Sequence, residues 1–225
     1  MKKFVIIVAG GSGNRMGSEI PKQFLQLCEK PVLMHTIQVF FDFDPESELI
    51  LALPADQLGV WAELCLKHSF SLPHQIVSGG ETRFHSVQNG LKLIQEEGIV
   101  FVHDGVRPLV SQETLERCYV MARKSGNAIP VLPVTESLRK LDGDQNVSVD
   151  RSLYFSVQTP QTFRSEVILK SYLQPYQPDF TDDASVVEKA GFPIFMVDGN
   201  RENIKITNPT DLIVAEVFLR AKVKK

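Results

Sequence analysis

The stretch that decides the fold is Phe4-Val5-Ile6-Ile7-Val8-Ala9, followed directly by Gly10-Gly11-Ser12-Gly13-Asn14-Arg15-Met16-Gly17. Its first part is a continuous apolar run, which is typical of a strand buried on both faces of a parallel sheet. The glycines that follow allow a close approach of the backbone to a ligand and can direct N–H groups at an anion. A buried strand that ends in such a loop predicts ligand binding at the carboxyl edge of an α/β sheet.

Further short apolar runs alternate with helical patterns along the chain. The runs cover Glu48 to Pro54, Gln75 to Val77, Ile99 to His103, Ala128 to Val134 and Pro193 to Val197. Apolar spacings of three and four residues lie between them, beginning at Leu58, Val87 and Leu115. This rhythm predicts right-handed βαβ crossovers. We therefore expect a single α/β domain over residues 1–225, with a doubly wound, mostly parallel, Rossmann-like sheet.

The alternation is interrupted between Thr135 and Val157. The polar turn Asp142-Gly143-Asp144-Gln145-Asn146 is flanked by short strand-like segments, which predicts a protruding β-hairpin arm over about residues 135–157. Beyond it, we expect Thr181 to cap a helix that ends before Gly191, and Pro209 to open the last helix.

Composition excludes several classes of protein. The 225 residues carry 24 basic and 27 acidic side chains, a net charge of −3, so no overall positive field attracts nucleic acid or an anionic membrane. Cys28, Cys65 and Cys118 lack the spacing of zinc sites or a disulfide framework. The apolar run at the start is too short for an export signal, and no run suits a membrane helix. We expect a soluble, cytoplasmic protein.

The glycine loop fits neither of two familiar nucleotide-binding patterns. Met16 occupies the third glycine position of the dinucleotide fingerprint, and Arg15 stands where a P-loop would continue toward its Gly-Lys pair. What remains is an anion-binding loop with its own arginine, followed by Lys22. A guanidinium and an ammonium together suit a triphosphate. The alternative at this stage is a flexible connection with two surface charges.

Several other residues are candidates for a ligand site. Asp104 follows an apolar strand and suits a Mg²⁺ ion shared with phosphate oxygens, although an ordinary loop cap is the alternative. Gly79-Gly80-Glu81 and Ser86 enter a helix and offer N–H groups and a hydroxyl to a base or ribose. Cations and hydroxyls suited to a second phosphate are Arg151, Thr159, Thr181 and Lys205. Each alone also fits a surface charge or a cap.

Two apparent metal motifs are better explained by structure. Asp142-Gly143-Asp144 resembles an Asp-x-Asp metal motif but lies in the predicted hairpin turn. The histidines His35, His68, His74 and His85 lack metal-ligand spacing. We interpret all of these as structural residues.

Taken together, the motifs resemble those of the 2-C-methyl-D-erythritol 4-phosphate cytidylyltransferases, and the resemblance covers nearly the whole chain. It rests on Ala9 to Gly17, Pro21-Lys22-Gln23-Phe24-Leu25, Gly79-Gly80 with Arg83 and Ser86-Val87, His103-Asp104 with Arg107-Pro108, Thr159-Pro160-Gln161, Thr181 to Ser185, and Asn203 to Thr207. It implies transfer of a cytidylyl group from CTP to methylerythritol phosphate, assisted by Mg²⁺, in a homodimer.

The resemblance also implies a role for each matching residue. The catalytic residues would be Arg15, Lys22, Arg151 and Lys205, and the metal ligand would be Asp104. The CTP site would comprise Ala9, Gly10, Gly11, Gly13, Gly79, Gly80, Glu81, Ser86, Asp104 and Gly105. The acceptor site would comprise Arg107, Ser137, Arg151, Thr159, Thr181 and Lys205, with the arm carrying Ser137 and Arg151 toward the partner's site.

Three other functions are compatible with parts of this sequence. Ribitol-5-phosphate cytidylyltransferases share the first loop and the Thr-Pro-Gln segment, so another sugar phosphate is an alternative acceptor. A glycosyltransferase of similar fold requires an Asp-x-Asp motif after a strand, which this chain lacks. A non-catalytic nucleotide-binding regulator is disfavoured because Lys22, Asp104 and Lys205 are all present.

Overall fold

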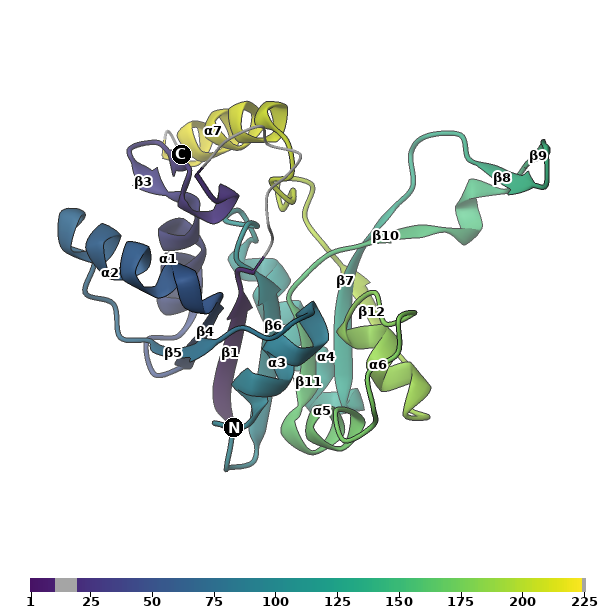
Figure 1. The fold of residues 1–225 in the computed structure, drawn as a ribbon. Coiled ribbons are helices and arrows are strands. Elements are labelled where there is room, and N and C mark those ends of the chain that lie inside the picture. The colour runs from purple at the N-terminus through teal and green to yellow at the C-terminus, as the bar shows by residue number, and fades with distance from the viewer. Residues whose placement is uncertain (11–19, 224–225) are drawn as a thin grey trace.

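The computed structural model describes residues 1–10 and 20–223 and is built around one large sheet (Figure 1). The order of its strands is β10-β7-β11-β6-β1-β4-β5, with β12 paired to β7. These strands are β1 (Lys2–Val8), β4 (Glu48–Leu53), β5 (Gln75–Ser78), β6 (Gly98–Asp104), β7 (Asn127–Pro133), β10 (Phe155–Val157), β11 (Gln161–Arg164) and β12 (Met196–Asp198). The pairs β1–β4, β1–β6, β4–β5 and β12–β7 are parallel. The predicted mostly parallel α/β sheet is therefore confirmed.

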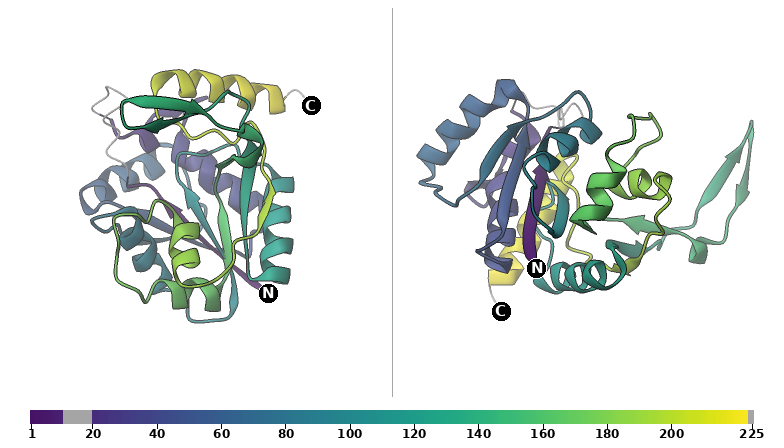
Figure 2. Two further views of the ribbon diagram at one scale, coloured as in Figure 1. Left: turned by 90° about the vertical axis from the view of Figure 1, so that its right-hand side faces the viewer. Right: turned by 90° about the horizontal axis from the view of Figure 1, so that it is seen from below.

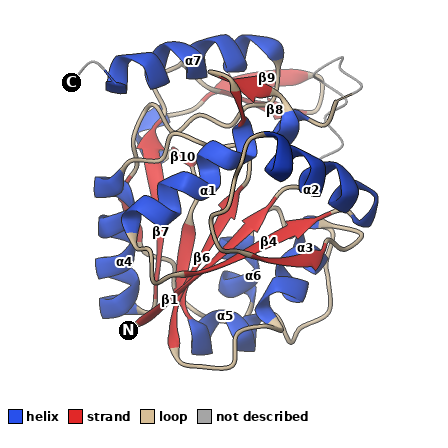
Figure 3. Ribbon diagram, turned by 90° about the vertical axis from the view of Figure 1, so that its left-hand side faces the viewer, coloured by secondary structure: helices blue, strands red, loops and turns tan. Residues whose placement is uncertain are grey.

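Helices cover both faces of this sheet because residues of each central strand alternate between two cores. Val5 and Ile7 of β1 pack with α1, α2 and α4, whereas Phe4 and Ile6 pack with α3, α5 and α6. Figure 3 shows α1 and α2 in front of the strands and α3, α5 and α6 behind them. The helices are α1 (Val32–Phe43), α2 (Leu58–Lys67), α3 (Arg83–Leu91), α4 (Gln112–Ser125), α5 (Ser165–Ser171), α6 (Asp183–Lys189) and α7 (Pro209–Val223).

The sheet contains two strands that the apolar runs do not predict, β10 and β11. β11 lies antiparallel between β6 and β7, and its residue Phe163 is fully buried. The cis peptide bond between Thr159 and Pro160 precedes it. The last predicted strand is displaced slightly, from Pro193–Val197 to Met196–Asp198. β11 places the Gln158-to-Gln161 segment beside the end of β6.

The predicted helix cap at Thr181 is wrong. The N-cap of α6 is Asp182, whose carboxylate accepts a hydrogen bond from the Ser185 amide, while the Ser185 hydroxyl accepts one from the Asp182 amide. This reciprocal capping box satisfies two N–H groups at once, which one threonine could not do. Thr181 is exposed just before the cap.

A small hairpin projects from the body of the protein. Its strands are β8 (Arg139–Asp142) and β9 (Gln145–Ser148), joined through Gly143, whose φ of +60° suits glycine. Figure 2 shows this arm extending away from the central sheet, connected through β10. A second short hairpin pairs β2 (Gln26–Leu27) with β3 (Lys30–Pro31) beneath α7. In the described part of the chain, no helix has the length and apolarity that crossing a membrane requires.

Candidate active site

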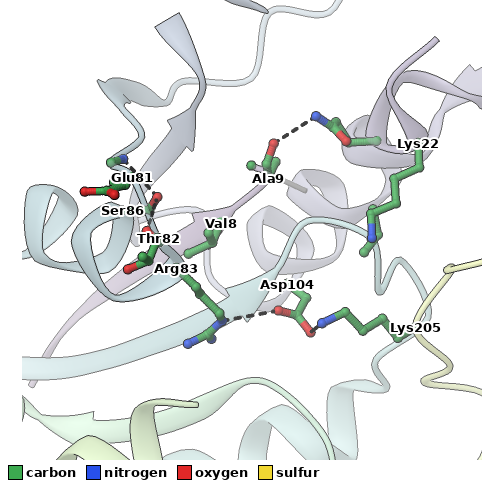
Figure 4. Close-up of a pocket in the computed structure, with 13 residues that line it drawn as sticks. Val8, Ala9, Lys22, Glu81, Thr82, Arg83, Ser86, Asp104 and Lys205 are labelled. Carbon is green, nitrogen blue, oxygen red and sulfur yellow. Dashed lines mark hydrogen bonds and ion pairs between the residues drawn. The ribbon is translucent and has the colours of Figure 1, made fainter. Parts of the chain in front are cut away.

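The carboxyl ends of the central parallel strands meet around one cavity (Figure 4). Val8 at the end of β1 is in register with Asp104 at the end of β6, and Leu53 of β4 is in register with Ser78 of β5. The cavity has a volume of about 250 Å³. Its lining includes the predicted residues Ala9, Gly10, Lys22, Gly80, Glu81, Ser86, Asp104 and Lys205. The ligand edge expected from the strand pattern is therefore where these side chains gather.

Asp104 is the electrostatic centre of this region. Its Oδ2 lies 3.0 Å from Lys205 Nζ and 3.1 Å from Arg107 Nε. Its Oδ1 faces Arg83 Nε at 3.6 Å. Burial would raise the pKa of Asp104, but the three cations outweigh burial and hold that pKa well below its usual range. The carboxylate is therefore ionised at every physiological pH.

A buried histidine and a threonine support Asp104 from behind. The Asp104 amide donates to Thr159 Oγ1 at 3.1 Å, and that hydroxyl lies 3.0 Å from His103 Nδ1. His103 Nε2 lies 3.0 Å from the carbonyl oxygen of Arg107 and therefore carries the ring proton, because a carbonyl only accepts. Burial lowers the pKa of His103 to about 4. The neutral ring and Thr159 thus fix the backbone that carries Asp104 and Arg107.

Lys22 reaches the cavity from a 3₁₀ turn over Lys22–Phe24, which two buried neighbours anchor. The Gln23 side chain is fully buried and donates through Nε2 to the Ala9 carbonyl at 2.9 Å and to Gln57 Oε1 at 2.6 Å. Phe24 stacks on Trp61 with ring centroids 6.2 Å apart. These anchors hold Lys22 at the cavity, on the same side of the view as Lys205 and across from Glu81 and Ser86 (Figure 4).

The segment from Gly80 to Ser86 forms another wall of the cavity. Some of its groups that are expected to face a ligand form hydrogen bonds within the segment instead. The Gly80 amide donates to Ser86 Oγ at 3.0 Å, and Ser86 Oγ donates to the Thr82 carbonyl at 3.0 Å. A Cβ on Gly80 would lie 2.3 Å from the Cβ of His85, so only glycine fits there. The Ser86 hydroxyl therefore shapes the loop that lines the cavity, and it keeps one lone pair that can accept a further hydrogen bond.

Gly79 and Gly105 are both predicted for the nucleotide site, but neither lines this cavity. The Gly79 amide donates to the Leu53 carbonyl at 2.7 Å, and the Gly105 amide donates to the Val8 carbonyl at 2.8 Å. They extend the pairing of their strands by one residue. A Cβ on Gly105 would lie 2.9 Å from the Ala9 side chain, so this glycine permits close packing behind the cavity.

A second cavity of about 320 Å³ lies on the other side of Asp104. It shares Arg83, Asp104 and Lys205 with the first. Its lining also contains the predicted acceptor residues Arg107, Thr159 and Thr181, together with Gln158, Gln161 and Asp182. Two cavities that share one carboxylate and its cations have the layout needed to bring two anionic reactants together.

Buried anchors set the positions of the two cations between the cavities. Arg107 donates through Nη1 to the Asn203 carbonyl at 2.8 Å, and the Asn203 side chain donates to the Thr159 carbonyl at 2.8 Å. Ile206 is fully buried, and its amide donates to the Val106 carbonyl at 3.0 Å. Lys205 lies in the chain between the anchored residues Asn203 and Ile206, and its side chain is 40% exposed. It is thus held in place at its backbone while its ammonium stays accessible.

The arm separates two predicted residues from the cavities. Ser137 and Arg151 are exposed on the arm, and the Arg151 guanidinium donates to the carbonyl of Thr135. Neither residue lines either cavity of its own chain. The predicted residues Gly11, Gly13 and Arg15 lie outside the described residues.

Asp104 also defines where a divalent cation could bind. Among the described residues, no cluster of three or more His, Cys, Asp or Glu side chains has metal-binding geometry. Mg²⁺ commonly uses only one or two carboxylates and takes its other ligands from substrate phosphates and water. Asp104 Oδ1, which faces only a 3.6 Å ion pair with Arg83 in the described chain, suits that single-carboxylate role.

Sequence reasoning quoted Arg83 in a motif but gave it no role in the site. Arg83 lines both cavities and forms a bidentate ion pair with Asp183, at 2.9 and 2.6 Å. The two residues lie 100 positions apart, so no local spacing reveals the pair. Two features of the sequence point toward the pair. Arg83 stands at the start of a predicted helix after Gly79-Gly80, and Asp183 follows Asp182 in the first turn of another predicted helix.

The sheet, the strand-end cavity and the carboxylate that both cavities share with its surrounding cations are those of an α/β nucleotidyltransferase. The family model described as 2-C-methyl-D-erythritol 4-phosphate cytidylyltransferase matches residues 3–221. The chain belongs to this 2-C-methyl-D-erythritol 4-phosphate cytidylyltransferase family.

Individual relatives agree with this membership over their full lengths. The enzyme of that name from Bacteroides thetaiotaomicron is 52% identical over 219 residues, which are 97% of this chain and 100% of the relative. The one from Porphyromonas gingivalis W83 is 51% identical, covering 97% of this chain and 98% of its own. The crystal structure of the Thermus thermophilus enzyme has a TM-score of 0.80 at 31% identity, covering 98% of this chain and all of that one.

Proposed function

We propose that this protein transfers the cytidylyl group of CTP to 2-C-methyl-D-erythritol 4-phosphate and releases pyrophosphate. The observation that carries the proposal is the pair of cavities that share Asp104 and Lys205. A transferase for two phosphorylated reactants needs such a shared cationic centre, because the reactants repel each other. The names of the relatives supply the identities of the two substrates.

The first cavity suits CTP. Its floor is the Ala9–Gly10 backbone, and the loop around Gly80 and Glu81 forms the wall where a base and ribose would lie. Lys22 and Lys205 both line this cavity, across from Glu81 and Ser86, and suit the triphosphate (Figure 4). We place Gly11, Gly13 and Arg15 in the same binding loop by the family resemblance.

The second cavity suits the acceptor phosphate. Arg107 presents a guanidinium there, beside Gln158, Gln161 and the exposed Thr181. Thr159 lies in its wall, but its hydroxyl already bonds to the Asp104 amide and His103. We therefore assign Thr159 to support of the carboxylate and assign the acceptor phosphate to Arg107 and Lys205.

The proposed reaction is one in-line displacement at phosphorus. An oxygen of the acceptor phosphate forms a bond to the α-phosphorus of CTP, while the bond from that phosphorus to the α–β bridging oxygen breaks. The electron pair leaves with pyrophosphate, so no covalent intermediate on the protein is needed. The acceptor phosphate is already ionised near neutral pH, so no general base is required. Lys22 and Lys205 stabilise the charge on the α-phosphate and on the departing pyrophosphate.

Asp104 is the residue proposed to hold Mg²⁺. A bound Mg²⁺ would supply Lewis-acid stabilisation of the phosphate oxygens. The neighbouring cations serve two purposes in the free protein: they keep Asp104 ionised, and they balance its charge until the phosphates arrive. Phosphate oxygens can then take over Lys205 and Arg107, which releases Asp104 Oδ2.

We propose further that the active form is a homodimer in which the arm reaches the partner's site. Exposed apolar side chains gather where the arm joins the sheet: Leu153 is 75% exposed, Phe155 42% and Met196 52%. Phe155 and Met196 line a groove with Val120 of α4. Such a contiguous apolar surface is typical of an interface. In this arrangement Ser137 and Arg151 would approach the partner's acceptor phosphate.

The test is a pyrophosphate-release assay on the purified protein with Mg²⁺. Each of the four ribonucleoside triphosphates is offered with methylerythritol phosphate and, separately, with ribitol 5-phosphate. We expect release only with CTP and methylerythritol phosphate. Faster release with ribitol 5-phosphate would reassign the acceptor, and no release with either acceptor would refute the transferase proposal.

A further inference from the structure

Arg83 belongs to a buried network that lies outside the roles described above. Its Nη1 and Nη2 bond to the two carboxylate oxygens of Asp183, a residue with no exposed surface. The Tyr172 hydroxyl donates to Asp183 Oδ1 at 2.6 Å. Tyr172 is itself held by a stacked contact with Phe84, at 4.6 Å between ring centroids. The Arg83 guanidinium is therefore fixed by one carboxylate that is fixed in turn by one phenol.

The geometry of this pair separates Arg83 from the phosphate-binding cations. Asp183 occupies the guanidinium edge formed by the two Nη groups, which is the edge that would otherwise bind a phosphate in a bidentate way. Burial opposes the charge, but Asp183 raises the pKa of Arg83 above its usual range, so the guanidinium stays charged. Its Nε edge is directed at Asp104 Oδ1, 3.6 Å away (Figure 4). Arg83 thus meets the reaction centre through Asp104.

The same pair joins the walls of the two cavities. Arg83 is the first residue of α3, directly behind the Gly80–Thr82 loop of the first cavity. Asp183 is the first residue of α6, directly behind Thr181 and Asp182 of the second cavity. A movement of either helix start would therefore pull on the other through two charge-assisted hydrogen bonds.

We propose that Arg83 is a positioning residue that sets the Asp104 carboxylate and holds the two substrate cavities in register, and that Asp183 and Tyr172 lock it in place. The proposal rests on the transferase function proposed above. Its consequence is that the Tyr172 hydroxyl, which lines neither of these two cavities, contributes to turnover. Because the Tyr172 hydroxyl acts on alignment in the transition state, removing this hydroxyl lowers kcat more than it raises the KM of either substrate.

The test compares two tyrosines of one aromatic cluster. Tyr172→Phe removes the hydroxyl that bonds to Asp183 and retains the ring that stacks on Phe84. Tyr176→Phe removes a hydroxyl from the ring 5.8 Å from Phe84, and that hydroxyl has no hydrogen bond within the described residues. We expect Tyr172→Phe to lower kcat about 5- to 10-fold with both KM values within about twofold, and Tyr176→Phe to match the wild type.

A second comparison asks whether Tyr172 acts through Arg83. Arg83→Lys retains the charge but loses the bidentate fork, so we expect a larger loss of kcat than for Tyr172→Phe. The double variant should be no slower than Arg83→Lys alone. Losses that multiply, or a Tyr172→Phe enzyme that is less thermostable with an unchanged kcat, would overturn the proposal. An inactive wild type would instead refute the transferase function and is read separately.

Discussion

The centre around Asp104 and the hairpin arm differ in how far one chain can organise them. Asp104 is 7% exposed and meets three cations from three separate segments, each held by buried neighbours. Every residue of β8 and β9 is exposed, and within the described residues Arg151 bonds to a carbonyl of the arm itself. The first region is organised within the chain before any ligand binds. The arm residues Ser137 and Arg151 line neither cavity of their own chain, which agrees with the proposal that they act in a partner's site.

The difference gives the two regions different expected sensitivities. In a buried ion-paired centre, removing one charge leaves its partners uncompensated and displaces them. In an exposed arm, a substitution affects only what the arm touches after assembly. Substitutions around Asp104 should therefore cause a large loss of activity. A substitution in the arm should instead be compensated when the variant subunit is mixed with a subunit whose arm is intact.

The largest effect is expected for Asp104→Asn. The amide has the same shape but no charge, so Lys205, Arg107 and Arg83 lose the carboxylate that balances them and the proposed metal loses its protein ligand. We expect kcat/KM to fall about 10³-fold or more. The control is Asp56→Asn, which removes an exposed carboxylate from the middle of the Ala55–Gln57 turn. Activity within tenfold of the wild type for Asp104→Asn would show that the centre is not organised around this carboxylate.

Lys22→Ala should have the next largest effect. Its ammonium meets charge that develops mainly in the transition state, so we expect kcat to fall about 10²- to 10³-fold with a smaller change in the KM for CTP. Lys67→Ala removes an exposed lysine from the last turn of α2 and serves as the matched control. An increase in KM at an unchanged kcat would show that Lys22 binds the ground state and the transition state equally, which contradicts this role.

The sequence predicts the centre better than it predicts the network around it. The end of the buried run at Asp104 predicts a carboxylate at the ligand edge, because strand burial depends on local composition. The Arg83–Asp183 pair depends on two helix starts that only the tertiary fold brings together. No helix was predicted over Val32–Phe43 because its N-terminus has no side-chain cap and its sequence is apolar on most sides.

The arm illustrates the opposite limit of sequence reasoning. Its turn residues are local signals, and the hairpin lies within the predicted segment. The role proposed for the arm needs a second chain, which local signals do not describe, and only the family resemblance suggests that role for Ser137 and Arg151. β11 was not predicted because an antiparallel strand of four residues, three of them polar, lacks the continuous apolar run of its neighbours.

A mixing experiment tests the arm directly. Arg151→Ala and Lys22→Ala subunits are each expected to be inactive alone, since one lacks the arm residue and the other the cavity lysine. If the arm acts across the dimer, each mixed dimer holds one intact site. An equal mixture should then recover about a quarter of wild-type activity, because about half of its dimers are mixed. No recovery after proven subunit exchange would place both residues in one chain's site.

The smallest expected effect is on the free energy of unfolding and not on turnover. It tests whether His103, which supports Asp104 from behind, is shielded from solvent. His103 has a folded-state pKa of about 4, below the roughly 6.5 of an unfolded histidine. Between these two pH values the unfolded chain binds the proton and the folded chain does not. Stability from this group is therefore complete above pH ~6.5 and falls as the pH decreases toward ~4, by up to about 3 kcal/mol.

The measurement is chemical denaturation of the wild type and of His103→Gln between pH 7 and pH 4. The difference between the two proteins should shrink as the pH falls, while contributions from all other groups cancel. Asp104 does not interfere, because its lowered pKa makes its contribution disappear only below about pH 4. An NMR titration gives a direct check: the His103 ring should stay neutral down to about pH 5. A ring that titrates near pH 6.5 would mean that solvent reaches the back of Asp104, and the contrast between a preorganised centre and an unorganised arm would then be weaker than the structure indicates.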